Sequence, residues 1–513
     1  MALLAWAAIA GLVARATHFF RDRPLWYDEA ALAINIVERS YIELLEPLRW
    51  AQSAPPLFLI LAKLLAELFG PGEQTLRAIS FLCGIALMPV TYVVARRIAG
   101  SQVAAVAAAL VALSPVVVSY SAELKPYTSD ALVSGVLLLA TTGAQPGLSL
   151  PRLLTLGAGG FLAILMSTPA ICTLGGIAAV WAWESRRQVR TLGRVAVLAG
   201  FWCVSFLIVA FLVHGSVASP SADIGRFMQA YWDPFFLDVP VRELPARAAQ
   251  IFYGLVPQML FGDLAPNGAM MTTGLLIVAG TAALIVQRRR SSLLLLSAPI
   301  ALLAIAARLS LYPMAPRLSL FTVIPIAILL ATGIWGTTPR SSRAGLVALR
   351  LGVTTLVIVL MTRSLIIDVR LAPRTEASRD FIASLMTDAS DATPVWISFG
   401  AGPAWEFYSR VMRPLDARPP SAAEVLRAVG TEGFRSLPPP DQQRRFREWG
   451  DIEVARLQAT GASCARLLLW HTTPEEYDGI RSAVERAGGS TPSTQESRGA
   501  YLIRACFPRA GER

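Results

Sequence analysis

The chain has 513 residues, of which 54% are hydrophobic and only 16% are charged. Soluble domains carry roughly 25% charged residues, so this composition excludes an ordinary soluble protein and indicates an integral membrane protein. The net charge of +11 does not indicate nucleic-acid binding, because the arginines gather at the ends of apolar segments, where basic residues set membrane orientation.

Apolar runs recur through the first 367 residues, with the length of about 20 residues that a transmembrane helix requires. The first run has no clear small-residue cleavage site, so it is predicted to remain as a span. The runs predict about eleven spans in all. They cover residues 1–20, 77–95, 103–120, 127–143, 153–167, 170–183, 195–213, 272–286, 293–309, 318–335 and 344–367.

Dense arginine groups between closely spaced runs predict the orientation of the chain. The positive-inside rule assigns these groups to the cytoplasm. An odd number of spans then places the N-terminus inside and the C-terminal region outside. Arg15, Arg21 and Arg23, at the outer end of the first span, run against the rule. The four groups are Arg96–Arg97, 186–194, 288–290, and Arg340 with Arg343.

A further apolar run at Pro56–Gly70 is not counted as a span. It has only about 15 residues, whereas a span usually needs 17–25. Lys63 and Glu67 stand four residues apart, on one helical face. We expect a juxtamembrane helix lying at the outer membrane surface. Counting this run as a span would invert every later loop and place all four arginine groups outside.

The predicted outer loops hold most of the residues that can carry chemistry. They are a long first loop over 21–74, a short one over 119–127, a long aromatic-rich one over 215–267, and a short one over 312–317. The membrane domain is predicted over 1–370, and a small extracytoplasmic α/β domain over 371–513, where helical and strand patterns alternate. A disulfide between Cys464 and Cys506 fits a domain outside the cytoplasm.

Two adjacent acids, Asp28 and Glu29, follow the aromatic pair Trp26 and Tyr27 in the first outer loop. One interpretation is a general base at the membrane boundary, helped by its neighbouring acid. The other is helix capping, with Asp28 as the N-cap of a helix over 28–40 and Glu29 in its first turn. Taken alone, the pair favours capping.

The second outer loop, "AELKPY", contains Glu123 and Lys125, and Asp130 follows just inside the next span. A carboxylate at the mouth of a span is costly unless it has a partner or a role. Lys125 is one of only two lysines in the chain, and a lysine ammonium is a compact charge suited to phosphate. A simple surface pair between Glu123 and Lys125 is the alternative.

Arginines near the last outer loop are candidate phosphate ligands. Arg317, in "YPMAPR", is a cation at a span mouth, and Arg308 stands one turn inside the preceding span. Snorkelling to the interface is the alternative for Arg317. The three histidines are scattered, which disfavours a histidine-built metal site. No Gly-rich phosphate loop occurs.

Acids, cations and aromatic loops on one outer face fit an enzyme that uses a lipid-borne phosphate donor. A lipid-linked oligosaccharide flippase would need ionisable residues along a path through the bilayer, whereas these charges gather at the outer mouths. A non-catalytic membrane scaffold that displays the C-terminal domain is the third hypothesis.

Four segments, in this order, resemble the GT-C glycosyltransferases, in particular the bacterial branch related to protein O-mannosyltransferases and the lipid A aminoarabinose transferase. The resemblance covers roughly the first 335 residues and rests on motif order and a common outward side. The segments are "LWYDEAALA" at 25–33, "SAPPLFLIL" at 53–61, "SPVVVSYSAELKPYTSDAL" at 114–132 and "YPMAPRLSLF" at 312–321.

The resemblance implies an inverting enzyme that transfers a sugar from a polyprenyl-phosphate donor to an acceptor hydroxyl, on the periplasmic side of a bacterial inner membrane. Asp28 would be the catalytic base and Glu29 its support. Lys125, Arg317 and Arg308 would bind the donor phosphate. Residues expected to contact substrate are Trp26, Tyr27, Glu123, Tyr127, Asp130 and Tyr312.

Some features stay open even with this resemblance. The second-loop acid of the family matches either Glu123 or Asp130. Some relatives carry Lys or His just before the "PPL" step, where this chain has Ser53 and Ala54. No cofactor or required metal is expected. The acceptor can be a glycan, a lipid or a protein, and neither the sugar nor the role of the C-terminal domain follows from the sequence.

Overall fold

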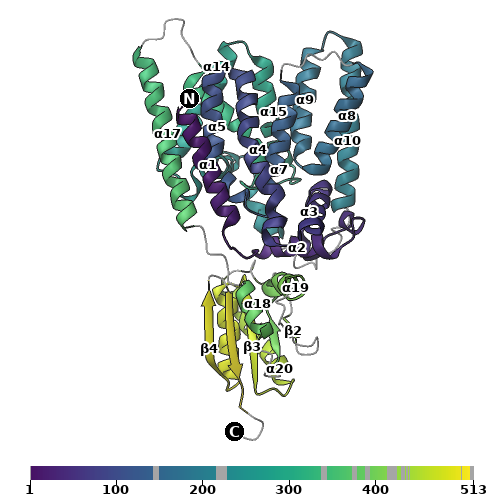
Figure 1. Cartoon of the computed structure of the whole chain (residues 1–513), viewed down its shortest axis with the longest axis vertical. Helices are drawn as coiled ribbons and strands as arrows, with labels where there is room; N and C mark the ends of the chain where they lie inside the picture. Colours follow the sequence, from purple (N-terminus) through teal and green to yellow (C-terminus); the bar gives the residue numbers. More distant parts are fainter. Residues whose placement is uncertain are drawn as a thin grey trace.

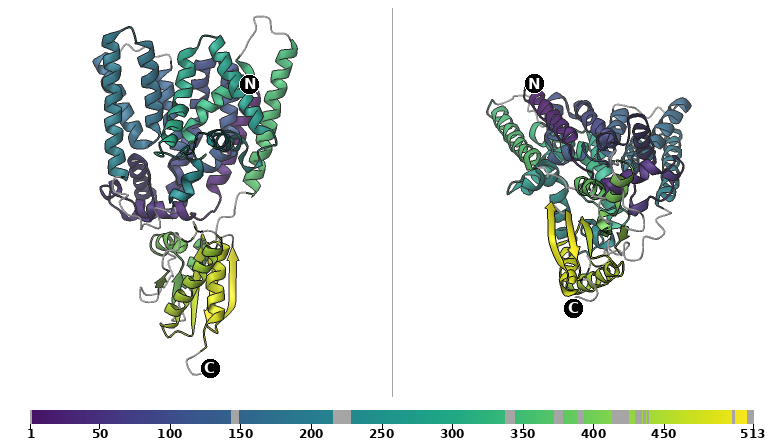
Figure 2. Two further views of the ribbon diagram at one scale, coloured as in Figure 1. Left: turned by 180° about the vertical axis from the view of Figure 1, so that it is seen from behind. Right: turned by 60° about the horizontal axis from the view of Figure 1, so that its bottom comes forward.

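The computed structural model describes residues 2–142, 149–214, 228–336, 344–371, 378–387, 393–412, 425–428, 434, 437, 439–497 and 500–508. A layer of long, roughly parallel helices forms one end of the molecule and a smaller α/β domain forms the other (Figure 1). Figure 2 shows the same two parts from behind and from below. The N-terminus lies at the end of the helical layer that is far from the α/β domain.

The helical layer is built from the following α-helices. They are α1 (Ala2–Phe20), α2 (Tyr27–Glu38), α3 (Pro56–Phe69), α4 (Glu73–Ala99), α5 (Ser101–Leu113), α6 (Pro115–Tyr120), α7 (Tyr127–Thr141), α8 (Leu150–Met166), α9 (Ala170–Glu184), α10 (Val189–His214), α12 (Leu244–Tyr253), α13 (Met259–Phe261), α14 (Ala269–Val286), α15 (Arg290–Arg308), α16 (Val323–Trp335) and α17 (Ala344–Leu371).

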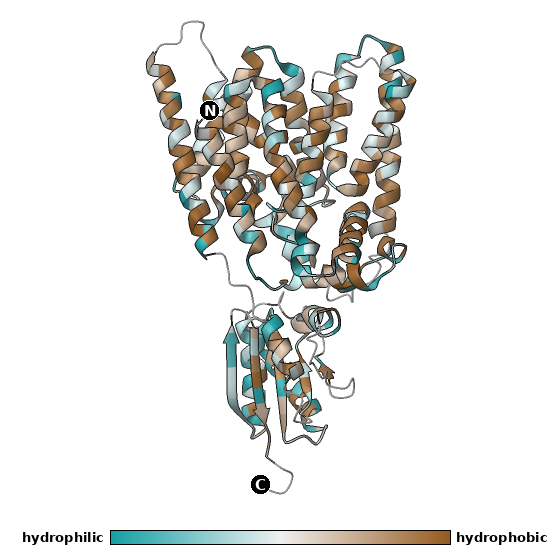
Figure 3. Ribbon diagram, viewed as in Figure 1, coloured by the Kyte–Doolittle hydropathy of each residue, from teal (hydrophilic) through white to brown (hydrophobic). Residues whose placement is uncertain are grey.

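Each predicted span corresponds to one of these helices, except the span over 103–120, which corresponds to two. Five of them, α4, α10, α14, α15 and α17, are long and apolar enough to cross a membrane by themselves. Shorter apolar helices stand at the positions of α1, α5, α7, α8 and α16, and α9 fills the remaining predicted position. Figure 3 shows hydrophobic residues along these helices. The chain is a multi-pass membrane protein.

The predicted span over 103–120 is broken into α5 and α6 at Ser114, which caps α6 by accepting a hydrogen bond from Val117 N–H (3.3 Å). Arg15 of α1 is fully buried beside this break. Its guanidinium donates to the carbonyls of Ala112 (2.8 Å) and Val111 (3.1 Å), at the end of α5. A buried arginine therefore satisfies carbonyl groups that the broken helix leaves open.

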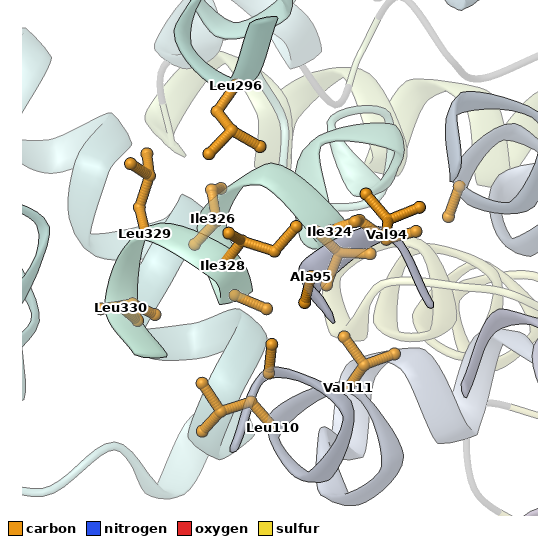
Figure 4. Packing of buried hydrophobic residues seen from close by; sticks show 14 of the residues in the cluster. Val94, Ala95, Leu110, Val111, Leu296, Ile324, Ile326, Ile328, Leu329 and Leu330 are labelled. Atoms are coloured by element: carbon orange, nitrogen blue, oxygen red, sulfur yellow. The ribbon is translucent and has the colours of Figure 1, made fainter. Parts of the chain in front are cut away.

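Close helix packing holds the centre of the layer together. Gly280 of α14 and Gly333 of α16 face each other, and a Cβ on either would lie 2.1 Å from a carbonyl oxygen of the opposite helix. Small residues allow such close approach between membrane helices. Side chains of α4, α5, α15 and α16 also pack together in the main hydrophobic core, among them Val94, Leu110, Leu296 and Ile324 (Figure 4).

The juxtamembrane helix α3 lies at the expected end of the layer, but its orientation differs from the prediction. Figure 1 shows it roughly parallel to the neighbouring spans rather than flat along a surface. Its buried residues, including Phe58, Leu59 and Ala62, pack into a core with α2 and α4. Burying the apolar face of this helix against protein removes it fully from water, which is more favourable in free energy than leaving it partly exposed at the membrane surface.

The C-terminal domain contains helices α18 (Ser378–Thr387), α19 (Gly402–Arg410), α20 (Pro439–Gln458) and α21 (Pro474–Arg486). Its strands are β1 (Val395–Ile397), β2 (Val425–Arg427), β3 (Cys464–Trp470), β4 (Ser490–Ser497) and β5 (Ala500–Cys506). The sheet order is β2-β1-β3-β5-β4. β1 pairs in parallel with β2 and β3, and β5 pairs antiparallel with β3 and β4. Cys464 and Cys506 are register partners and form the expected disulfide.

The C-terminal domain shares a hydrophobic core with the first-loop helices instead of standing apart from them. Leu25, Leu32 and Phe58 belong to the same buried cluster as Phe407 and Trp470. Polar contacts reinforce the junction. The Tyr408 hydroxyl accepts a hydrogen bond from Leu25 N–H (2.6 Å) and donates one to Glu73 (2.7 Å). The domain therefore fixes the position of the segment that carries the acidic pair.

Candidate active site

The acidic pair lies in the first turn of α2, which begins at Tyr27 with Trp26 as its N-cap residue. The capping role considered for Asp28 is therefore wrong, because Asp28 lies inside the helix. Glu29 makes the capping contact instead, by accepting a hydrogen bond from the Trp26 backbone N–H (3.3 Å). The Asp28 carboxylate remains available for other partners.

Glu29 is a buried structural anchor. Its carboxylate binds the Arg77 guanidinium through two contacts, of 2.7 and 2.6 Å, and both side chains are almost completely buried. It also accepts a hydrogen bond from Leu124 N–H (2.7 Å) in the second outer loop. Burial acts to raise the pKa of Glu29, but Arg77, Arg23 and the Leu124 N–H together outweigh it, and the pKa lies below its ordinary value. Glu29 thus joins α2, α4 and the second loop.

Asp28 faces two cations from different outer loops. Its Oδ2 atom lies 3.8 Å from Lys125 Nζ and 3.8 Å from Arg317 Nη1. Gln52 bridges Lys125 and Asp28: its amide oxygen accepts from Lys125 (2.7 Å) and its amide nitrogen donates to Asp28 Oδ1 (3.4 Å). Asp28 is 23% exposed, whereas Lys125 is only 7% exposed. Burial lowers the pKa of Lys125, and Asp28 opposes this shift.

Arg317 is held by aromatic rings of the long loop before α14. Its guanidinium lies 5.0 Å from the ring centre of Trp232 and 5.7 Å from that of Tyr231. It also donates to the Tyr231 hydroxyl (3.2 Å). Such cation–π contacts orient an arginine without consuming its charge. This loop segment therefore serves the site, although the part of the predicted loop over 215–227 lies outside the described residues.

Of the two second-loop acids, Glu123 is the one beside the cations. It interacts electrostatically with Arg23, Arg77 and Lys125, and burial raises its pKa to about 7. Asp130 lies inside α7 and is only 4% exposed. Within the described ranges it forms no ion pair with Lys125, which pairs with Asp28 instead. Of the two acids, Glu123 is therefore the one that interacts electrostatically with Lys125.

The aromatic candidates are divided between two places. Tyr27 stacks on His471 of the C-terminal domain, with ring centres 4.9 Å apart and planes 16° apart. Tyr127 lies within electrostatic reach of Asp28 and Arg317. Tyr312 is deeper, beside Asp130, and donates to the Leu318 carbonyl (3.3 Å). The Trp26 indole N–H is buried without a hydrogen-bond partner in the described part of the chain.

Arg308 does not join this cluster. Its guanidinium pairs with Asp238 at 2.7 Å, and both side chains are largely exposed. Among the contacts of the described residues, none links Arg308 to Asp28, Lys125 or Arg317. The expected phosphate-binding role of Arg308 therefore has no geometric support, because its cation is already paired with an acid of the aromatic loop.

Sequence reasoning missed Gln52, Arg77, Tyr231, Trp232 and His471. Arg77 begins a predicted span, and its burial against Glu29 is a long-range contact that no local pattern shows. The richness of the 215–267 loop in aromatic residues was the one signal for Tyr231 and Trp232. No sequence signal pointed to Gln52, since a single glutamine shortly before the "PPL" segment has no distinctive chemistry.

Comparisons with known proteins identify the fold of the chain. Residues 53–214 match the family model for dolichyl-phosphate-mannose-protein mannosyltransferase. The structure resembles ArnT from Cupriavidus metallidurans bound to undecaprenyl phosphate, with a TM-score of 0.56 and 16% identity over 98% of this chain and 97% of that one. The chain has the GT-C fold. No curated protein sequence matches it significantly.

A second GT-C protein is similar over most of this chain. This is the archaeal oligosaccharyltransferase AglB from Archaeoglobus fulgidus, in complex with an inhibitory peptide and a dolichol-phosphate. It superposes with a TM-score of 0.53 at 13% identity, over 98% of this chain and 74% of that one. At such low identities the likeness defines the fold, and the roles of individual residues rest on the geometry described above.

Proposed function

We propose that the chain is an inverting glycosyltransferase that moves a sugar from a polyprenyl-phosphate donor to an acceptor hydroxyl. The observation that carries the proposal is the meeting of Asp28 with Lys125 and Arg317, each 3.8 Å away, at one end of a GT-C helical layer. A carboxylate can accept a proton, and two cations can stabilise a phosphate leaving group.

The chemistry assigns a separate task to each side of this cluster. Asp28 takes the proton of the acceptor hydroxyl as that oxygen attacks the anomeric carbon of the donor. The bond between the anomeric carbon and the phosphate oxygen breaks, and Lys125 and Arg317 neutralise the negative charge that develops on the departing polyprenyl phosphate. Attack opposite the leaving group inverts the anomeric centre.

The remaining site residues support this reaction. Glu29 and Arg77 hold α2 against the second outer loop. Glu123, Trp26, Tyr27 and Tyr127 are proposed to contact the substrates. Because two protein cations supply the positive charge that the phosphate needs, the proposal requires no divalent metal.

We assign the site to the periplasmic side of a bacterial inner membrane. The basic α9–α10 and α14–α15 connections, 186–194 and 288–290, lie at the end of the helical layer opposite the C-terminal domain (Figure 1). The positive-inside rule then favours a cytoplasmic N-terminus and a periplasmic C-terminal domain. Polyprenyl carriers whose sugars face the periplasm would reach the site from the membrane, and the acceptor would be a glycan, lipid or protein there.

The proposal is tested with purified full-length protein in vesicles made from the whole envelope extract of cells lacking the protein, which supplies both the polyprenyl-phosphate sugar and the acceptor. Release of polyprenyl phosphate is measured by mass spectrometry. We expect release by the wild type, and a loss of at least about a hundredfold in Asp28→Asn, because the amide cannot act as a base. Lys125→Gln is expected to be similarly impaired, and EDTA is expected to change little.

Asp238→Asn provides the matched control, because Asp238 is an outer-loop acid that pairs with Arg308 away from the cluster. It should release polyprenyl phosphate at the wild-type rate. Near-normal turnover by Asp28→Asn would show that the base is misassigned. An inactive wild type in this envelope extract would contradict the proposed activity as a whole.

A further inference from the structure

The loop before α3 adopts an uncommon backbone conformation where it meets the C-terminal domain. The short helical turn η2 (Arg49–Ala51) contains two consecutive non-glycine residues with positive φ, Trp50 at 63° and Ala51 at 52°. L-amino acids with side chains rarely adopt this left-handed region, and a pair of them persists only where the surroundings enforce it.

The C-terminal domain supplies this enforcement through the Trp50 indole. A Cβ on Gly402 of α19 would lie 2.4 Å from the indole Cη2 atom, so only glycine leaves room for the ring. The indole N–H donates to Glu406 of the same helix (3.2 Å), and the ring packs steeply against Phe399, with ring centres 5.3 Å apart and planes at 68°. Figure 1 shows α19 directly beside α2 at the junction of the two parts.

Neighbouring contacts fix both ends of this turn. Asn35 of α2 holds the Arg49 main chain by accepting from its N–H (2.8 Å) and donating to its carbonyl (3.2 Å). Glu406, only 5% exposed, is in turn held by Arg427 at 2.8 Å. Hydrogen bonds and packing therefore fix the turn to α2 on one side and to the C-terminal domain on the other.

Gln52 follows the turn, and its amide is fully engaged. The amide nitrogen donates to the Trp50 carbonyl (3.3 Å) and to Asp28 Oδ1 (3.4 Å), while the amide oxygen accepts from Lys125 (2.7 Å). A primary amide has two N–H donors, so these contacts define its orientation. Gln52 therefore bridges the side chains of Lys125 and Asp28, whose nearest charged atoms, Lys125 Nζ and Asp28 Oδ2, are 3.8 Å apart.

We propose that Trp50 is a positioning residue through which the C-terminal domain orients Gln52, and that Gln52, by bonding to both groups, holds the Asp28 carboxylate and the Lys125 ammonium 3.8 Å apart and keeps them from closing to direct hydrogen-bond contact. This inference rests on the proposed function. It gives the C-terminal domain a task in catalysis: a base locked to Lys125 could not accept the acceptor proton, and the lysine would be withheld from the donor phosphate.

The test compares Trp50→Ala, Gln52→Ala and the double variant in the vesicle assay described above. Each single variant should lower kcat by at least about tenfold, because a small misplacement of reacting groups is enough to slow the reaction strongly. The double variant should be about as slow as Gln52→Ala alone, since residues that act through one another are not additive. Trp50→Phe, which keeps a ring but loses the bond to Glu406, should be impaired less.

Two glycine variants separate positioning from damage to folding. Gly402→Ala crowds the Trp50 ring, whereas Gly450→Ala crowds the Gly479 carbonyl at the same distance of 2.4 Å, in the other core of the C-terminal domain. The inference expects Gly402→Ala to slow turnover and Gly450→Ala to retain it. Multiplicative losses in the double variant, wild-type turnover in Trp50→Ala, or equal losses in the two glycine variants would overturn it. A wild type without turnover contradicts the proposed function instead.

Discussion

At the residue scale, adjacent acids have unlike surroundings. Asp28 is partly exposed and faces Lys125 and Arg317, while Glu29 is completely buried against Arg77. The sequence predicts that the pair matters but not how its tasks divide, because successive helical residues point about 100° apart and their partners lie far along the chain. Removing one partner of a buried ion pair such as Glu29–Arg77 leaves an uncompensated charge.

The pKa of Glu123 leads to a prediction about stability. Burial raises this pKa from 4.5 to about 7, so between these values the folded protein binds more protons than the unfolded chain. The contribution of Glu123 to stability therefore falls as the pH rises through this window. Glu29 behaves in the opposite way, because its pKa is lowered in the folded protein. Its contribution to stability is lost at lower pH, as the pH falls through its folded-state pKa.

Thermal unfolding of Glu123→Gln, measured from pH 4.5 to pH 7, checks this sign. The glutamine resembles the protonated acid, so the variant should lose less stability than the wild type as the pH rises. Parallel curves for the two proteins would show that Glu123 does not titrate in this range.

At the element scale, apolar periodicity located the spanning helices well but not their interruptions. The break between α5 and α6 depends on Ser114 and on Arg15 from another helix, and the upright placement of α3 depends on its packing partners. In the C-terminal domain, β1, β3 and β5 were predictable because they are apolar. β4 is mostly exposed and polar, and so gives no hydrophobic signal.

The disulfide between Cys464 and Cys506 joins β3 to β5 across a separation of 42 residues. Protein isolated without reductant should show both thiols protected from alkylation, as expected for a domain in an oxidising compartment. Replacing both by Ser should destabilise the domain by about 2–4 kcal/mol, since the open chain gains entropy when unfolded. Cys203→Ser, at an exposed position on α10, should leave stability unchanged. Reactive thiols at 464 and 506 in the native protein would contradict a periplasmic assignment.

At the scale of the whole molecule, the site is assembled from segments that are distant in sequence. Asp28, Lys125 and Arg317 come from three loops, and contacts such as Leu25 with Tyr408 span 383 residues. The sequence could place the loops on one side by counting spans, and the family resemblance could name most of the candidates. It could not reveal the contacts from the C-terminal domain, because nothing local marks Trp50 or His471 as interface residues.

If the protein is the proposed transferase, deleting it should change the composition of the membrane lipids. Cells lacking the protein should accumulate a polyprenyl-phosphate sugar, and mass spectrometry of their lipid extract would identify that sugar from its mass. Expression of the wild type should clear the accumulated lipid, and expression of Asp28→Asn at the same level should leave it in place. A lipid extract unchanged by deletion, or cleared equally well by Asp28→Asn, would contradict the assignment of a polyprenyl-phosphate-sugar transferase with Asp28 as its base.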